Sequence, residues 1–160
     1  NYPVPDSTVG GGLVARMSPT FPNEAISLGD IVRTLPEEGS IPHLPDWKWI
    51  HTPGHSPGHV SFFREKDRVL IVGDAFVTVK QESLFRVLIQ EKEISGPPKY
   101  LTTDWKAAWE SVKLLEQLKP EVAITGHGVP VSGEELTTEL AKLANNFASI
   151  GMPIQGRFLN

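Results

Sequence analysis

The chain has 160 residues, of which 39% are hydrophobic and 21% charged, a composition typical of a globular protein of one domain. Its formal net charge of −4 without a basic run excludes nucleic acid as the main expected partner, and no apolar stretch approaches the ~20 residues of a membrane span. The absence of cysteine excludes disulfides and thiolate ligands and fits a cytoplasmic protein, so any metal site must use His, Asp or Glu.

The first part of the chain, residues 1–46, is predicted to be an irregular linker segment with short strands. Its first twelve residues (NYPVPDSTVGGG) show no helical period and are rich in turn-forming residues. LVARM at 13–17 is predicted as a short strand. AISLGDIVRTLP at 25–36 is predicted as a hairpin, because two short apolar runs flank Gly29 and Asp30.

Three strands are expected next. WKWIHT at 47–52 alternates and is rich in aromatic and β-branched residues. VSFFRE at 60–65 and RVLIVGD at 68–74 form the clearest hairpin, turning at Lys66 and Asp67. The second of these runs is continuously apolar, which predicts a strand covered on both faces.

The next segments lead to a helix. SLFRVLIQ at 83–90 fits a helix and a strand equally, and ISGPPKY at 94–100 is predicted as a loop. From 104 to 118 the apolar residues keep helical spacing, with Thr103 or Asp104 as the N-cap and Pro120 after the end.

A last strand and helix complete the chain. EVAIT at 121–125 is predicted as a buried strand, and the residues 132–135 (SGEE) have the spacing of a capping box. They open a helix that places Leu136, Leu140, Leu143, Phe147 and Ile150 on one side and stops near Gly151. The order of strands, helix, strand and helix indicates an α/β domain with helices packed on a sheet.

The stretch HTPGHSPGH at 51–59 holds three of the five histidines at four-residue spacing, which would place them on one face of a helix. Two internal prolines cost ~3 kcal/mol each and two glycines about 1 kcal/mol each, so no helix forms. The segment is therefore predicted to be a loop, and each histidine has to be judged alone, either as a ligand or as an ordinary hydrogen-bonding residue.

Three strands end in similar short motifs. Gly54 precedes His55, Gly73 precedes Asp74, and Gly126 precedes His127. Strand ends facing a crevice are where α/β folds place ligands, and a glycine lets the backbone approach closely. Neutral imidazole and carboxylate are suitable ligands for zinc, iron or manganese, so the pattern predicts a metal site.

In their order along the chain, HTPGHSPGHV, the strand ending in GDA and the late TGHG resemble the metallo-β-lactamase-fold hydrolases, in the glyoxalase II and lactonase branch rather than the true β-lactamases. The resemblance implies a four-layer αββα sandwich with metals at one edge of the sheets. Residues 47–160 are then expected to be the C-terminal portion of such a domain.

The resemblance assigns roles residue by residue. His55 resembles a ligand of the first metal, Asp74 the carboxylate that bridges two metals, and His127 a ligand of the second. His59 is expected to support the loop, and His51 to be strand-end structure. The expected cofactor is zinc, as two ions in the full-length protein, where a metal-bound hydroxide would attack an ester, thioester, lactone or amide carbonyl of a small-molecule substrate.

One family signature, HxHxDH, is absent, since the sole histidine before residue 51 is His43. The chain also starts without Met, so we expect a C-terminal fragment of a longer hydrolase whose N-terminal half is missing. Such a fragment is predicted to have no catalytic residue of its own, an incomplete metal site and no activity. It is also expected to dimerise over an uncovered apolar sheet face. The alternative is a non-catalytic binding or assembly module that keeps the fold without a complete metal site.

Overall fold

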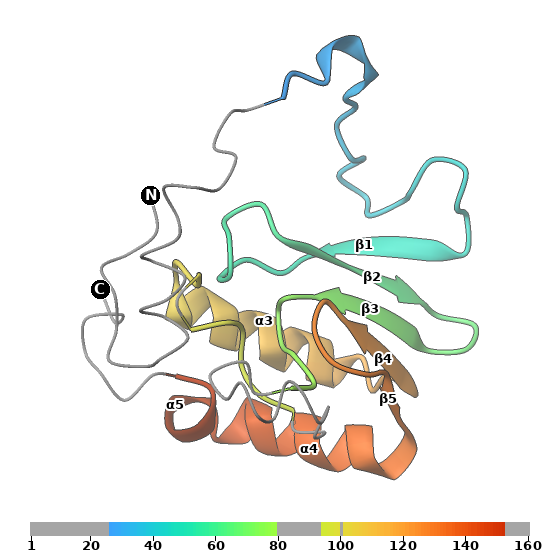
Figure 1. Cartoon of the computed structure of the whole chain (residues 1–160). Helices are drawn as coiled ribbons and strands as arrows, with labels where there is room; N and C mark the ends of the chain where they lie inside the picture. The colour runs from blue at the N-terminus through green and yellow to red at the C-terminus, as the bar shows by residue number, and fades with distance from the viewer. Residues whose placement is uncertain (1–25, 80–93, 100, 153–160) are drawn as a thin grey trace.

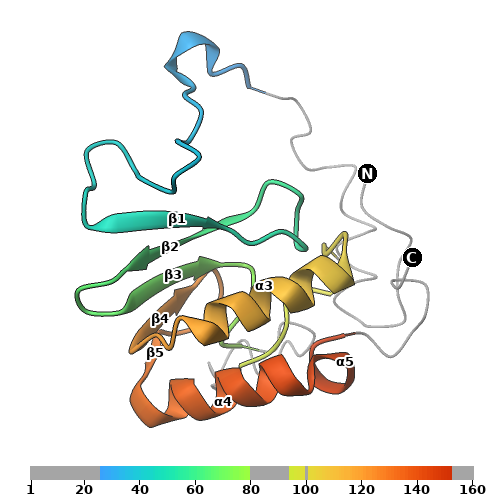
Figure 2. The same ribbon diagram turned by 180° about the vertical axis from the view of Figure 1, so that it is seen from behind.

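The structure, a computed structural model, describes residues 26–79, 94–99 and 101–152. Five strands of this part form one sheet in the order β1-β2-β3-β4-β5, and the two longer helices lie on the same side of it (Figures 1 and 2). The strands are Trp47–His51 (β1), Val60–Arg64 (β2), Val69–Gly73 (β3), Val122–Thr125 (β4) and Val131–Ser132 (β5). The helices are Trp105–Gln117 (α3), Gly133–Asn145 (α4) and Phe147–Ile150 (α5), with a 3₁₀ turn at Gly29–Ile31 (η2). The predicted α/β class is confirmed.

The pairing of the strands sets the direction in which each of them runs. β1, β2 and β3 are antiparallel neighbours, whereas β3 and β4 are parallel and are joined by a connection that contains α3. Since β1 runs antiparallel to β2 and β2 antiparallel to β3, the strands β1, β3 and β4 all point the same way. Their carboxyl ends therefore meet at one edge of the sheet, which is where the predicted ligands follow.

One face of the sheet carries the core. Leu70 and Val72 of β3 are 0% exposed and pack into a cluster with both longer helices, whereas Ile71 between them is 37% exposed. The register aligns Ile71 with Trp49, Phe62 and Ile124 in a row across four strands on the opposite face. The prediction that β3 would be covered on both faces is wrong for the described residues, because the described helices pack on one face alone.

The helix α3 begins as predicted. Asp104 is its N-cap, and the Asp104 carboxylate accepts a hydrogen bond from the Ala107 amide at 2.9 Å. Trp109 stacks on Phe147 with ring centroids 6.3 Å apart and donates a 2.7 Å hydrogen bond to the Ala144 carbonyl. Trp105, 4% exposed, also packs against Phe147, so both tryptophans join α3 to the α4–α5 corner.

The second predicted helix differs in two details. It is divided at Asn146 into α4 and α5, although Leu136, Leu140, Leu143 and Phe147 are buried as expected and α5 ends at Gly151. Ser132 is the N-cap residue as the predicted capping box requires, but its side chain makes no cap hydrogen bond. Ser132 is held in extended conformation because it belongs to β5, which pairs with β4.

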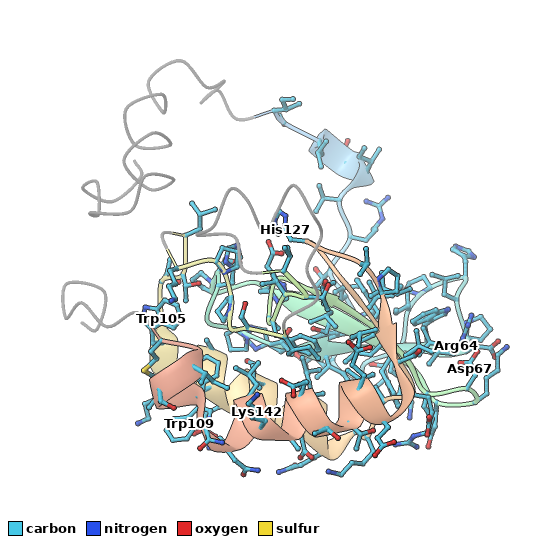
Figure 3. The ribbon with its side chains drawn as sticks, turned by 60° about the horizontal axis from the view of Figure 1, so that its bottom comes forward. Arg64, Asp67, Trp105, Trp109, His127 and Lys142 are labelled. Atoms are coloured by element: carbon cyan, nitrogen blue, oxygen red, sulfur yellow. The ribbon has the colours of Figure 1, made fainter. Side chains whose placement is uncertain are left out.

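The β2–β3 hairpin carries two arginine contacts at its far end. Arg64 pairs with Asp67 across the turn at 2.8 Å, and Figure 3 shows both at the opposite end of the view from Trp105. Arg68 donates from Nε to the Lys119 carbonyl at 2.7 Å and from its terminal nitrogen to the Leu118 carbonyl. A cation thereby satisfies the exposed carbonyls at the end of α3.

The segment before the sheet departs from expectation. The hairpin predicted at 25–36 is wrong for the described residues 26–36, where the 3₁₀ turn η2 stands instead. Its apolar side chains face no other element, Ile26 being 85% and Ile31 77% exposed, and a two-stranded hairpin without such packing is marginal. The strand predicted at 13–17 and the ambiguous segment 83–90 lie outside the described residues. In the described part, the helices are too short or too polar to cross a membrane.

Candidate metal centre

The three predicted ligands lie together at the edge where β1, β3 and β4 end. The Nε2 atom of His55 is 3.5 Å from Asp74 Oδ2, and the Nε2 atom of His127 is 3.5 Å from Asp74 Oδ1. The carboxylate is thus flanked by two imidazoles, one against each oxygen. The side chains of Asp74 and His55 are mostly buried, at 24% and 17% exposure, whereas His127 is 47% exposed. Figure 3 places His127 at the rim of the molecule, apart from the helices that carry Trp109 and Lys142.

The chemistry of this cluster fits a cation in part. His55 Nδ1 and Asp74 Oδ1 are buried and have no hydrogen-bond partner, which is costly for polar atoms away from water. Imidazole nitrogen and carboxylate oxygen are also the donor set that divalent zinc or iron accepts. Yet among the described residues no three His, Asp or Glu side chains are arranged to enclose a metal ion. One histidine lies near each oxygen of the Asp74 carboxylate, and a metal ion held there would need further ligands from other groups.

The electrostatics favour a neutral His55. Burial lowers the pKa of His55 below its ordinary value of 6.5, and His127 lowers it further, while the charge of Asp74 acts in the opposite direction. An imidazole must be unprotonated at one nitrogen to bind a metal. At neutral pH, His55 is therefore in the protonation state that a ligand requires.

His59 holds the Asp74 backbone. Its Nε2 atom accepts a 2.9 Å hydrogen bond from the Asp74 amide, so Nε2 carries no proton and the proton is on Nδ1. Nδ1 then donates to the Thr52 carbonyl at 3.0 Å. Burial lowers the pKa of His59, which keeps this neutral tautomer at neutral pH. These bonds join His59 to the backbones of Thr52 and Asp74.

A chain of buried hydroxyls continues from His59. Thr52 Oγ1 lies 2.9 Å from both His59 Nδ1 and Ser61 Oγ, and the Ser61 hydroxyl donates to the Val72 carbonyl at 2.9 Å. Since the Ser61 hydroxyl already donates its hydrogen bond to the Val72 carbonyl, the Thr52 hydroxyl is the donor to Ser61 Oγ. These bonds tie the loop after β1 to β2 and β3 just before Asp74.

The loop that carries His55 rests on α3. The Gly54 carbonyl accepts hydrogen bonds at 3.0 Å from the amides of Thr103 and Asp104, and the Ser111 hydroxyl donates to the Pro53 carbonyl at 2.7 Å. Gly54 has a φ of +134°, and a Cβ atom there would stand 2.4 Å from the Ala108 backbone. The prediction that glycine permits a close backbone approach before His55 is confirmed.

The remaining histidine of the motif is exposed. His51 is the last residue of β1, and its Nε2 donates to the Pro57 carbonyl at 2.8 Å. The prediction that 51–59 is a loop after the strand end is confirmed, since the structure has no helix between β1 and β2. Among the described residues, His51 thus bonds to the loop backbone rather than to Asp74.

Sequence reasoning missed the buried hydroxyls around the site. The described residues bury four polar side chains, and each of them bonds to a segment that positions a predicted ligand: Thr52, Ser61, Thr78 and Ser111. A signal exists for Ser61 and Thr78 alone, because each is a hydroxyl residue with apolar neighbours on both sides. Ser111 stands on the buried face of α3.

Comparison with known proteins places these features in context. A family model described as the metallo-beta-lactamase superfamily matches residues 3–127. Two Bacillus subtilis (strain 168) proteins are similar: YflN, a probable metallo-hydrolase, is 50% identical over 146 residues, which are 91% of this chain and 54% of YflN. YybB, also a probable metallo-hydrolase, is 32% identical over 112 residues, 68% of this chain and 45% of YybB. The chain thus spans about half the length of these relatives. Among solved structures, TTHA1623 in a di-iron-bound form is 28% identical with a TM-score of 0.49, over 89% of this chain and 57% of that one.

Proposed function

Because the chain belongs to the metallo-beta-lactamase superfamily, we propose that it supplies His55, Asp74 and His127 to the metal centre of a hydrolase. The single observation that carries this proposal is the carboxylate of Asp74 lying 3.5 Å from an imidazole on each side, at one sheet edge. YflN, which shares half of its aligned residues with this chain, is named a probable metallo-hydrolase, and we extend that class to this protein.

Each residue has a distinct task in this proposal. His55 and His127 would each hold one ion, and Asp74, with one oxygen toward each imidazole, would be shared between the two. When bound, divalent ions, zinc in our proposal, supply Lewis acidity toward an ester, thioester, lactone or amide carbonyl and lower the pKa of water to about 7. His59 keeps Asp74 in place by accepting a hydrogen bond from the Asp74 amide.

For the chain by itself, we propose that hydrolysis does not occur. Three groups serving two ions give each ion two protein ligands, one of them shared. A stable zinc site has three or four protein ligands, so this chain is expected to bind at most one ion, weakly. Two tightly held ions per chain after dialysis, measured by elemental analysis, would contradict this part of the proposal.

The test compares matched variants of the full-length protein. Asp74→Asn and His127→Asn are expected to lose metal and hydrolytic turnover of ester, thioester and lactone substrates together. His51→Asn is the control, because His51 belongs to the same loop as His55 yet bonds to the Pro57 carbonyl. Metal is quantified by elemental analysis, which also separates zinc from iron and manganese.

Two results would overturn the hydrolase proposal. One is full metal content in Asp74→Asn, which would remove the bridging role of the carboxylate. The other is a folded, full-length wild-type protein that takes up no metal and turns over no substrate. That second result would favour the binding or assembly module, which keeps the fold without the reaction.

We also propose that the isolated chain self-associates through its outer sheet face. The row of Trp49, Phe62, Ile71 and Ile124 is apolar and continuous over four strands, with Ile71 and Ile124 37% and 40% exposed. A contiguous apolar patch of this kind is commonly an interface. A second copy offers the same flat apolar face and satisfies a two-fold arrangement.

A further inference from the structure

We propose that Thr78 is the positioning residue that orients His127 toward Asp74, an inference that rests on the proposed role of His127 as a ligand. Thr78 lies four residues after Asp74 and is 1% exposed. Its backbone and side chain both bond to the loop 125–129 that carries His127. Among the described residues outside β4, no other residue makes as many hydrogen bonds to that loop.

The hydroxyl protons can be assigned from the distances. The Thr78 hydroxyl donates to the Val129 carbonyl at 2.7 Å, and the Thr125 hydroxyl donates to the His127 carbonyl at 2.8 Å. The Thr78 amide also donates to the His127 carbonyl at 3.1 Å. The His127 carbonyl therefore accepts two bonds, and the carbonyl two residues later accepts a third. These bonds hold the peptide plane between His127 and Gly128 and the plane between Val129 and Pro130.

The packing is close enough to hold this arrangement. Gly128 has a φ of +101°, and a Cβ atom there would lie 2.3 Å from Thr78 Oγ1. The loop therefore lies directly against the threonine, and a shift of either would open or crowd the contact. Thr78 Oγ1 is also 3.1 Å from Thr125 Oγ1, which closes the cluster from the β4 side.

His127 depends on this backbone support. Its side chain is 47% exposed, and the contact of its ring with a described side chain is the 3.5 Å approach to Asp74 Oδ1. Since the ring has one long contact, its position relative to Asp74 depends on where its backbone stands. Thr78 holds that backbone from the segment that follows Asp74, so one segment places both the carboxylate and its histidine partner.

The experiment uses Thr78→Val, which keeps the shape of the side chain and removes the hydroxyl. The readout is the imidazole ¹³Cε1 resonance of His127 in the metal-free chain, assigned with His127→Asn. We expect this resonance to move toward the position of an exposed histidine such as His43 or to broaden, while the His51 resonance stays unchanged. Thr78→Ser restores the hydroxyl and is expected to return the His127 resonance to its original position. Thr137→Val is the control, because Thr137 bonds within α4.

A metal measurement in the full-length protein completes the test. Loss of a residue that orients a metal ligand lowers metal affinity about 10–100-fold, so Thr78→Val is expected to fall in that range and Thr78→Ser to recover. An unchanged His127 resonance in folded Thr78→Val overturns the inference. If that variant does not fold, Thr78→Ala, which removes the same hydroxyl, replaces it with the same criterion. A shifted resonance together with normal metal content in His127→Asn supports the positioning role and rejects the ligand role.

Discussion

The close approach of Gly54 to α3 predicts a large difference between the two glycines of HTPGHSPGH. In Gly54→Ala the new methyl group would stand 2.4 Å from the Ala108 amide nitrogen and Cα, which are backbone atoms of a helix and cannot rotate away. The φ of +134° at this position adds strain for any residue with a side chain. Gly58 is the matched control, because a Cβ there meets no atom within 4 Å.

The expected magnitude follows from these two effects. A residue held in a sparsely populated backbone conformation costs about 1–3 kcal/mol. Forcing a methyl group into a packed contact costs about another 1–3 kcal/mol. Gly54→Ala should therefore lower the free energy of unfolding by about 2–6 kcal/mol, a large part of the ~5–15 kcal/mol of a typical domain. Gly58→Ala should stay within about 1 kcal/mol of the wild type.

The assay is urea unfolding at one fixed protein concentration, followed by tryptophan fluorescence and by circular dichroism. Trp105 reports directly, since it is the first residue of α3 and is buried. Equal unfolding midpoints for Gly54→Ala and Gly58→Ala would refute the reasoning. That result would mean that the loop before His55 does not rest on the helix as described.

Three further predictions concern the core, the hairpin turn and the outer sheet face. Phe147→Ala removes a ring that is 0% exposed and should cost about 3–5 kcal/mol in urea unfolding, whereas Leu114→Ala, at a 41% exposed position, should cost about 0.5 kcal/mol or less. Hydrogen bonds from Arg64 lower the pKa of Asp67 below its ordinary value of 3.8, so their contribution to stability is present above that pH and is lost as the pH falls through the lowered pKa. The midpoints of wild type and Asp67→Asn should therefore converge in acid unfolding series below pH ~4, and a constant difference would contradict this. Ile71→Lys should shift the isolated chain toward monomer in light scattering after size exclusion, and an unchanged mass would exclude the outer sheet face as the interface.

Much of the sheet and of α3 could be predicted because local sequence and packing agree there. The hairpin of β2 and β3 and the side-chain cap at Asp104 both stand where the sequence predicts them, and burial alternates along both strands against the helix layer. The failure of the predicted hairpin at 25–36 has a physical origin. The apolar runs at 26–36 predicted strands, but a strand requires a neighbour, and no element of the described chain pairs with this segment.

The candidate site also has a part that the sequence predicts and a part that it does not. Strand-end motifs indicated where His55, Asp74 and His127 stand along the chain, and the common direction of β1, β3 and β4 brings them together. The sequence could not indicate which groups the buried hydroxyls bond to, because those contacts join residues that are far apart in the chain. Ser111 and Pro53, for example, are 58 residues apart.

The bonds from Arg68 to the carbonyls of Leu118 and Lys119, just after α3, have a consequence for how the protein opens. They join the hairpin turn to a helix end about fifty residues later, so fraying of one exposes the orphan groups of the other. The amides of β3 and of the last turn of α3 should then exchange with deuterium in one shared event rather than in two. The amides near this corner should exchange most slowly, and those of the edge strand β1 should exchange first.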